Sequence, residues 1–313
     1  MIGQIANRLL LSIPVLFGVL LFGFLLLILV PGDPATVLAG PMAPPEVVAR
    51  IRLEMGLDEP VYVQFLAYLE RVMAGDLGRS LISNKTVSSE LIAAIGPTAE
   101  LMFACLVWSI PIGIGLGTLA AVWRGSLVDR AVMAFSVAGV SLPIFFICLV
   151  LIHFLGVKWQ VFPFIGRGGP LWTIDGLRHI ALPALSLGLI FIGPVARMTR
   201  SAVLEVLRLD HVRTARAKGL SERRVILRHG LRNALIPVVT LVGLQAGYLL
   251  GGAVVTETIF SWPGIGRLAV GAILSSDFPL AQGTILVLAL AFILINMIVD
   301  ILYALLDPRV QNR

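Results

Sequence analysis

The segment that decides the fold is a polar stretch between two apolar ones, Arg197–Asn233, which reads RMTRSAVLEVLRLDHVRTARAKGLSERRVILRHGLRN. It holds ten Lys and Arg residues against three Asp and Glu residues. The rest of the chain is strongly apolar, so this segment is the main charged surface that the chain can present to a soluble partner. A charged segment of this length must also lie outside hydrocarbon, and it therefore sets the topology of the apolar stretches on both sides.

Composition identifies lipid as the main solvent of the chain. Of 313 residues, 58% are hydrophobic and 13% are charged, whereas soluble domains carry about 25% charged residues. The net charge of +6 is explained by Lys and Arg concentrated on one side of a membrane, and it does not indicate nucleic-acid binding. Cys105 and Cys148 lie in apolar runs, where we expect small buried hydrophobic side chains and no disulfide.

Six apolar stretches reach the ~20 residues that span a bilayer. They cover residues 9–30, 98–122, 132–156, 180–199, 234–256 and 282–306. Backbone groups in hydrocarbon must be satisfied within the segment, so each stretch is predicted to be helical. The first stretch exceeds the ~7–15 residues of a signal-peptide core, and we expect a retained helix. The prediction is an all-α integral membrane protein with six transmembrane helices.

The distribution of Lys and Arg predicts the orientation. With the N-terminus inside, the inner segments hold fifteen of them and the short outer loops hold four. The outer loop 31–97 exceeds the ~60 residues up to which the positive-inside rule applies. Both termini are therefore predicted to be cytoplasmic.

The loop 31–97 is predicted to form a small helical cap on the external face. Pro45 opens an amphipathic pattern that Gly56 closes, and Pro60 opens a second one that Gly75 ends. The predicted organisation is thus a first helix within 1–30, the cap over 31–97 and a five-helix core over 98–313.

The cytoplasmic loop is predicted to be two helices joined by a sharp turn. Apolar residues recur every three or four positions over 202–218, which is typical of an amphipathic helix. Gly219 can adopt the left-handed conformation that ends a helix, and Ser221 suits the N-cap of the next one. The second helix should run from Glu222 past His229 into the fifth span. Such a loop is either a lever that transmits movement or a basic anchor that contacts anionic lipid.

Sequence patterns for catalysis are missing from this chain. GxxxxGK[ST], HExxH and GxSxG do not occur, so no catalytic or metal site is predicted. Asn296 and Asp300 share one side of the last span and are candidates for the substrate path, although Asp300 could instead pair with a loop arginine. His153 is predicted to be a packed core residue, and Glu100 and Glu257 are predicted to lie at the membrane interface. Because the spans lack a buried chain of acids, energy is expected to come from another subunit.

The cytoplasmic loop resembles the EAA motif of importer-type ABC transporter permeases, in the form typical of the dipeptide and oligopeptide group. The resemblance rests on Val212–Leu220 (VRTARAKGL), His229–Leu235 (HGLRNAL), Pro31–Pro34 (PGDP), Gly75–Ser80 (GDLGRS), Pro97–Leu101 (PTAEL), Ser141–Phe145 (SLPIF), Phe260–Arg267 (FSWPGIGR) and Leu306–Arg309 (LDPR). These blocks cover the chain in the expected order. The general EAA pattern is matched only in part, since its Glu falls on Arg213 and its first Ala on Thr214, while Ala215 and Gly219 match.

The resemblance implies a type I ABC importer permease fold in a bacterial or archaeal plasma (inner) membrane. It implies as partners a second homologous permease, two cytoplasmic ATPases and an external solute-binding protein. The chain itself would hold no cofactor and would not be an enzyme, because ATP and Mg would bind the ATPases. Residues 201–235 would form the coupling loop. Its candidate coupling residues are Arg213, Thr214, Ala215, Arg216, Lys218, Gly219, Ser221, His229 and Asn233.

Ala215 and Gly219 are small, so they would allow the ATPase to approach closely and would allow the chain to turn. For the solute, the resemblance favours dipeptides and oligopeptides, with glutathione or nickel as alternatives. Two other classes stay open: a secondary transporter or channel that works alone, and a membrane anchor whose basic loop binds lipid or a soluble partner.

Overall fold

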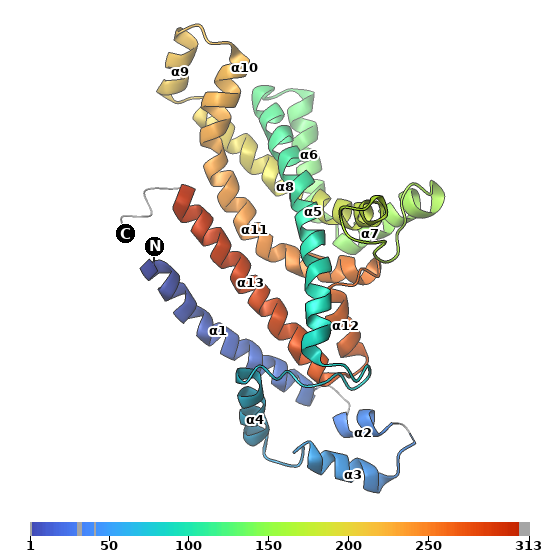
Figure 1. Cartoon of the computed structure of the whole chain (residues 1–313). Coiled ribbons are helices and arrows are strands. Elements are labelled where there is room, and N and C mark those ends of the chain that lie inside the picture. Colours follow the sequence, from blue (N-terminus) through green and yellow to red (C-terminus); the bar gives the residue numbers. More distant parts are fainter. Residues whose placement is uncertain (1, 30–32, 41, 307–313) are drawn as a thin grey trace. The chain divides into compact units, whose positions relative to one another are not determined.

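The structure, a computed structural model, describes residues 2–29, 33–40 and 42–306, and the elements of that part are helices (Figure 1). They are α1 (Ile2–Leu29), α2 (Pro34–Ala39), α3 (Pro45–Glu54), α4 (Val61–Met73), α5 (Val87–Val122), α6 (Leu127–Ser141), α7 (Ile144–Leu151), the π-helix η1 (Ile152–Lys158), α8 (Ile174–Val206), α9 (Asp210–Ala217), α10 (Glu222–Arg224), the π-helix η2 (Val225–Leu231), α11 (Arg232–Ile259), α12 (Ile265–Leu274) and α13 (Phe278–Leu306). Extended pairing within the described ranges is limited to one isolated bridge between Arg79 and Thr86. The predicted all-α class is confirmed.

The chain divides into two compact units. Of the described residues, the first unit comprises those within 99–262 and 294–306, and the second comprises those within 2–98 and 263–293. The boundary falls inside α5 and inside α13, so each of these helices contributes to both units. The division follows packing, whereas the segments 1–30, 31–97 and 98–313 describe membrane topology and remain a prediction.

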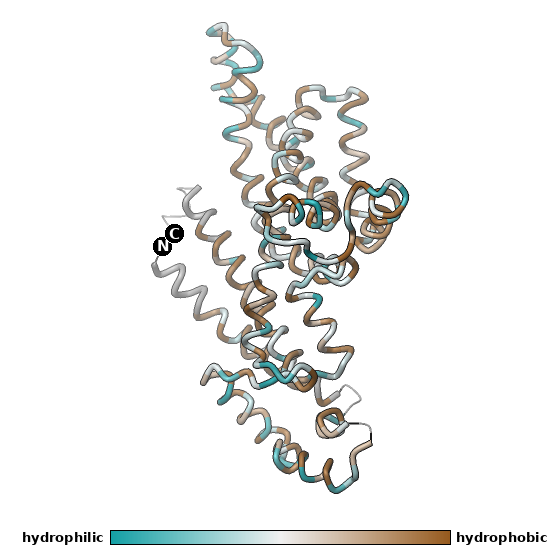
Figure 2. The backbone as a smooth tube through the Cα atoms, turned by 45° about the vertical axis from the view of Figure 1, so that its right-hand side comes forward, coloured by the Kyte–Doolittle hydropathy of each residue, from teal (hydrophilic) through white to brown (hydrophobic). Residues whose placement is uncertain are grey.

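Among the described residues, four helices are long and apolar enough to cross a membrane. They cover Val87–Val122, Ile174–Val206, Glu222–Ile259 and Phe278–Val299. A bent pair, Leu127–Ser141 with Ile144–Lys158, adds a fifth if it counts as one span. The first predicted span lies in α1, whose described apolar part is the shorter segment Leu10–Leu25. Figure 2 shows that hydrophobic residues dominate these long helices.

The third predicted span, 132–156, is not one straight helix. The chain bends by 106° between α6 and the arm formed by α7 and η1. Leu142 and Pro143 are extended at the bend, with ψ of 128° and 140°. Proline has no N–H to continue the helical bonds, and it pushes the residue before it out of the helical region. Pro143 is therefore the physical cause of the break.

The core of the first unit forms around α8, which packs against α6, α7 and α11. Leu101 and Cys105 of α5, Phe191 and Val195 of α8, and Trp262 are buried in one cluster. Cys105 and Cys148 are both free and buried, as the sequence predicted. This cluster fixes α8, and α8 in turn carries the start of the polar loop.

The second unit contains the predicted external cap. Helices α3 and α4 occupy the two predicted segments, and Gly56 and Gly75 have the expected positive φ values of 66° and 79°. Phe65 of α4 lies 5.3 Å, centroid to centroid, from Phe24 of α1. Two features were not predicted: α5 begins at Val87, well ahead of residue 98, and α12 follows the fifth span.

Candidate functional site

The polar loop is divided differently from the prediction of one helix over 202–218. Residues 202–206 complete α8, and a break precedes α9, which begins at Asp210. Val212 lies nine residues after Val203, about 2.5 turns along a helix at 3.6 residues per turn, so a continuous helix would place them on opposite faces. The break allows both side chains to enter one apolar cluster. Burial of that cluster is therefore the physical reason for the break before α9.

The apolar face of α9 packs onto its own chain. Val212 and Ala215 are buried against Val203 and Val206 of α8 and against Val225 of η2. The side chain of Ala215 therefore points inward and is not placed to let a partner approach closely. Its small size instead lets α9 lie close to α8 and η2.

The opposite face of α9 is polar and exposed, and Figure 2 shows hydrophilic residues gathered around the α9–α10 turn. The predicted coupling residues exposed there are Arg213, Thr214, Arg216, Lys218, Gly219 and Ser221. The Arg213 side chain is 72% exposed, and its Nη1 lies 3.3 Å from Asp210 Oδ1. The Thr214 hydroxyl donates to the Asp210 carbonyl at 2.9 Å. The surface is thus a row of cations on a helix that is held from behind.

The turn after α9 has the predicted left-handed glycine. Gly219 has a φ of +75°, and its N–H donates to the Arg216 carbonyl at 2.9 Å. Ser221 occupies the N-cap position of α10, but its side chain makes no capping hydrogen bond. Arg216 Nε donates to Glu222 Oε1 at 2.7 Å and so bridges the turn. The backbone conformation of Gly219 therefore sets the turn between α9 and α10, and the exposed Arg216–Glu222 pair spans it.

His229 lies on η2 and Asn233 on α11, so neither belongs to the exposed face of α9. Asn233 Nδ2 lies 3.3 Å from His211 Nε2 and donates to the His229 carbonyl at 3.4 Å. His211, at the start of α9, was not among the predicted residues. The second predicted helix does run from Glu222 into the fifth span, through η2 and α11. These contacts tie α9 to the start of α11.

One ion pair between α6 and α8, close to the polar loop, was not predicted from the sequence. Arg200 of α8 donates from Nε and Nη2 to Asp129 of α6, at 2.5 and 2.7 Å. Asp129 also accepts from the Gly125 N–H at 2.9 Å, and Ser126 accepts from the Asp129 N–H at 3.3 Å. A Ser followed three residues later by an acid is a helix-start signal that could have marked α6. Arg200 is thus paired within the chain.

The intramembrane candidates are only partly described. Asn296 is half-buried on α13, and for Asp300 the helical backbone is described while its side chain lies outside the described residues. Their role in a substrate path remains a prediction. Glu257 is fully buried among neighbouring side chains, and its place at the membrane interface stays a prediction. His153 is exposed and not packed in the core. The position of a residue along a span does not reveal whether its side of the helix faces neighbouring helices.

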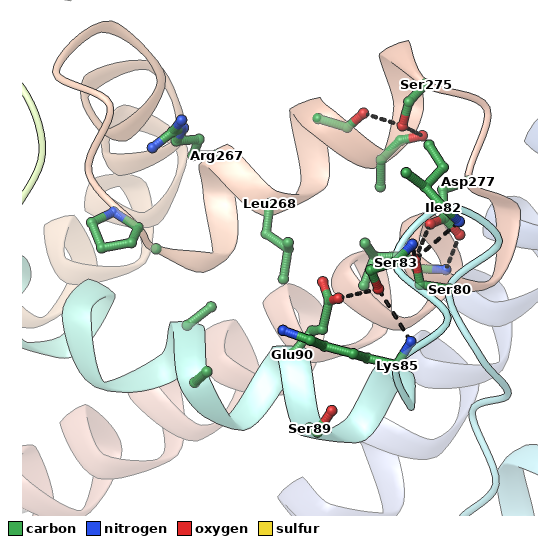
Figure 3. Close-up of a pocket in the computed structure, with 17 residues that line it drawn as sticks. Ser80, Ile82, Ser83, Lys85, Ser89, Glu90, Arg267, Leu268, Ser275 and Asp277 are labelled. Carbon is green, nitrogen blue, oxygen red and sulfur yellow. Dashed lines mark hydrogen bonds between the residues drawn. The ribbon is translucent and has the colours of Figure 1, made fainter.

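The second unit holds a cavity of about 710 Å³ between the turn before α5, the first turns of α5, and α12 (Figure 3). Asp277 at its edge is buried and accepts hydrogen bonds from the Ser80 hydroxyl and, at 3.2 Å, from the Leu81 N–H. Glu90 accepts from the Ser83 hydroxyl at 2.5 Å. Both carboxylates therefore already hold the loop before α5 in place.

Comparison with known proteins covers nearly the whole chain. Residues 113–312 match the model of the family described as "Binding-protein-dependent transport system inner membrane component", and residues 1–101 match the model of the corresponding N-terminal region. The glutathione transport system permease protein GsiC of Salmonella choleraesuis (strain SC-B67) is 43% identical over 313 residues, which is 100% of both chains. The protein of the same name from Escherichia coli (strain K12) gives the same values.

A solved structure, an amino acid ABC transporter with histidines, aligns with a TM-score of 0.50 at 14% sequence identity. The alignment covers 71% of this chain and 94% of that chain. At this identity the likeness bears on the fold alone, and it agrees with the helical arrangement described above.

Proposed function

Since the chain belongs to the family of inner membrane components of binding-protein-dependent transport systems, we propose that it forms a translocation pore with a second, homologous permease and is driven by two cytoplasmic ATPases. The chain is a multi-pass inner membrane protein and the permease subunit of an ABC importer. The separate ATPases would hydrolyse ATP. An external binding protein would deliver the solute to the permease.

The observation that carries the coupling proposal is the two-sided structure of α9. One face is packed against α8 and η2, and the other presents Arg213, Arg216 and Lys218 to solvent. A ligand changes a conformational equilibrium only through contacts that differ between the two states. A rigid helix joined through short segments to α8 and α11 is suited to pass such differential contacts to the spans. The alternative, a basic anchor for anionic lipid, does not require the fixed turn at Gly219.

For the solute we propose a short peptide, with glutathione, itself a tripeptide, as the first to test. Support comes from full-length relatives described as glutathione transport system permeases, together with the resemblance of the motifs to the dipeptide and oligopeptide group. Nickel is the alternative solute within the same architecture.

The test begins with purification of the chain together with its partner subunits and identification of the solute held by the accompanying binding protein. The complex is then placed in proteoliposomes, and ATP-dependent uptake of labelled glutathione, a dipeptide and Ni²⁺ is compared. Uptake of a peptide only with ATPases and binding protein present is the expected result. Uptake by the purified chain alone would establish a secondary transporter or channel, and a complete complex that moves no solute would favour the anchor.

A further inference from the structure

The Asp129–Arg200 ion pair is a bidentate contact between α6 and α8. Both oxygens of Asp129 are engaged by the guanidinium, and the Asp129 and Arg200 side chains are 6% and 25% exposed. A bidentate pair of this kind fixes orientation as well as distance. Separating the two partners would leave an uncompensated buried charge, which is strongly unfavourable. The pair therefore holds α6 and α8 in one relative position.

Arg200 lies directly before the part of α8 on which α9 rests. Ala202, Val203 and Val206 follow it on α8 and belong to the cluster that buries Val212 of α9. Asp129 lies in the first turn of α6, and the N–H of Gly125 in the α5–α6 turn donates to it. The pair therefore connects the seat of α9 to the turn between α5 and α6.

Close packing next to the pair keeps α5, α6 and α8 together. A Cβ at Gly117 of α5 would lie 2.3 Å from the Ala196 carbonyl oxygen of α8, and one at Gly193 of α8 would lie 2.6 Å from the Ser136 carbonyl oxygen of α6. Ala120 and Val132 are buried with Ala196 in a cluster shared by the same three helices. The ion pair closes this packed body at its cytoplasmic end.

We propose that Asp129 and Arg200 are positioning residues that join α6 and the α5–α6 turn to the coupling loop, so that displacement of α9 moves α6 together with α8. The inference rests on the proposed function, because it describes how the coupling loop moves the spans. Without the pair, α8 still moves with α9, but the cytoplasmic end of α6 is no longer attached to α8. Hydrolysis of ATP then continues while fewer solute molecules cross.

The test compares variants of the complete importer in proteoliposomes, measuring solute imported per ATP hydrolysed alongside thermal stability. Asp129→Asn keeps an acceptor for the Gly125 N–H and removes the charge. Coupling free energies correspond to about 5–150-fold effects, so we expect the transport ratio to fall about tenfold while basal ATP hydrolysis is retained. Arg200→Lys keeps the positive charge but cannot form the bidentate contact, so its transport ratio should fall by less. This variant replaces Asp129→Asn in the test if Asp129→Asn does not assemble.

Two further variants separate positioning from stability. Asp129→Asn/Arg200→Gln leaves no lone buried charge, so stability should recover while the transport ratio stays low. Glu100→Gln breaks a second bidentate pair, with Arg167, whose bonds are 2.9 and 2.7 Å. The Arg167 and Glu100 side chains are 25% and 19% exposed. The transport ratio of this variant should match that of the parent. The inference is overturned if the parent couples and the Asp129 variants import as much per ATP. A parent complex without solute-stimulated hydrolysis would instead overturn the proposed function.

Discussion

Gly219 shows how one residue sets the geometry of the polar loop. Its φ of +75° is costly for other residues, about 1–2 kcal/mol for an L-residue in the left-handed region, and a Cβ there would meet no atom within 4 Å. The constraint is therefore in the backbone and not in the space around it. Replacement should change the turn and leave the membrane-embedded part intact.

Gly219→Val is accordingly expected to insert normally and to lose solute-stimulated ATP hydrolysis, because a β-branched residue is a strong outlier at positive φ. Gly219→Asn is the matched control, since Asn adopts this conformation readily, and it should retain most of the stimulation. The measurement is hydrolysis with and without solute in the reconstituted importer, scaled to inserted complex. Full stimulation in the Val variant would show that the turn is not needed.

Gly115 and Gly117 lie on the same helix and differ only in their surroundings. At Gly117 a Cβ would lie 2.3 Å from the Ala196 carbonyl oxygen, whereas at Gly115 it would meet nothing within 4 Å. Gly117→Ala should lower the free energy of unfolding by about 1–3 kcal/mol through overpacking. Gly115→Ala should be neutral or gain up to about 1 kcal/mol from helix propensity. Thermal unfolding in detergent distinguishes them, and equal midpoints would contradict the close α5–α8 contact.

At the scale of the element, α9 is too short to be stable alone, because isolated helices below about 12–15 residues are marginal in water. Its eight residues are held by the burial of Val212 and Ala215. The sequence pattern predicted an amphipathic helix here, but it assigned Ala215 to close approach of the ATPase and not to the buried face. It could not locate the break before Asp210, because the break follows from the position of the cluster beneath both helices.

Val212→Asp should release α9 from that cluster, since a buried carboxylate without a partner is strongly unfavourable. The expected result is faster trypsin cleavage at the arginines of α9 in the purified protein. Thr214→Asp adds the same charge to the exposed face of the same helix and should leave cleavage near the parental rate. Similar rates in both variants would mean that the cluster does not hold α9.

The break at Pro143 is another place where an element differs from its prediction. Periodicity and length indicated one span over 132–156, and the proline was visible in the sequence. Whether a proline kinks a helix or bends the chain by 106° depends on what the two arms pack against, and α7 packs on α8 and α11. The neighbours, not the proline alone, select the larger bend.

At the scale of the whole molecule, the orientation in the membrane is still a prediction from the Lys and Arg distribution. In a background lacking Cys105 and Cys148, Met42→Cys should react with a membrane-impermeant maleimide in intact spheroplasts. Arg223→Cys in α10 should react only after the membrane is opened, because α10 is predicted to be cytoplasmic. Both positions are exposed, so access to reagent depends on the side of the membrane. The reverse pattern would invert the topology.

The helical membrane class, the cap helices, the turn at Gly219 and the polar face of α9 could all be predicted from the amino-acid sequence. Each of these depends on local properties: hydropathy over a window, helical periodicity, and the conformational freedom of glycine. Three other features became visible only in the folded chain: Ala215 faces inward, Arg200 is paired with Asp129, and Glu257 is buried. Such outcomes depend on which distant segments meet, because the burial or pairing of a side chain is a property of its neighbours in space and is not encoded in the residues beside it in the chain.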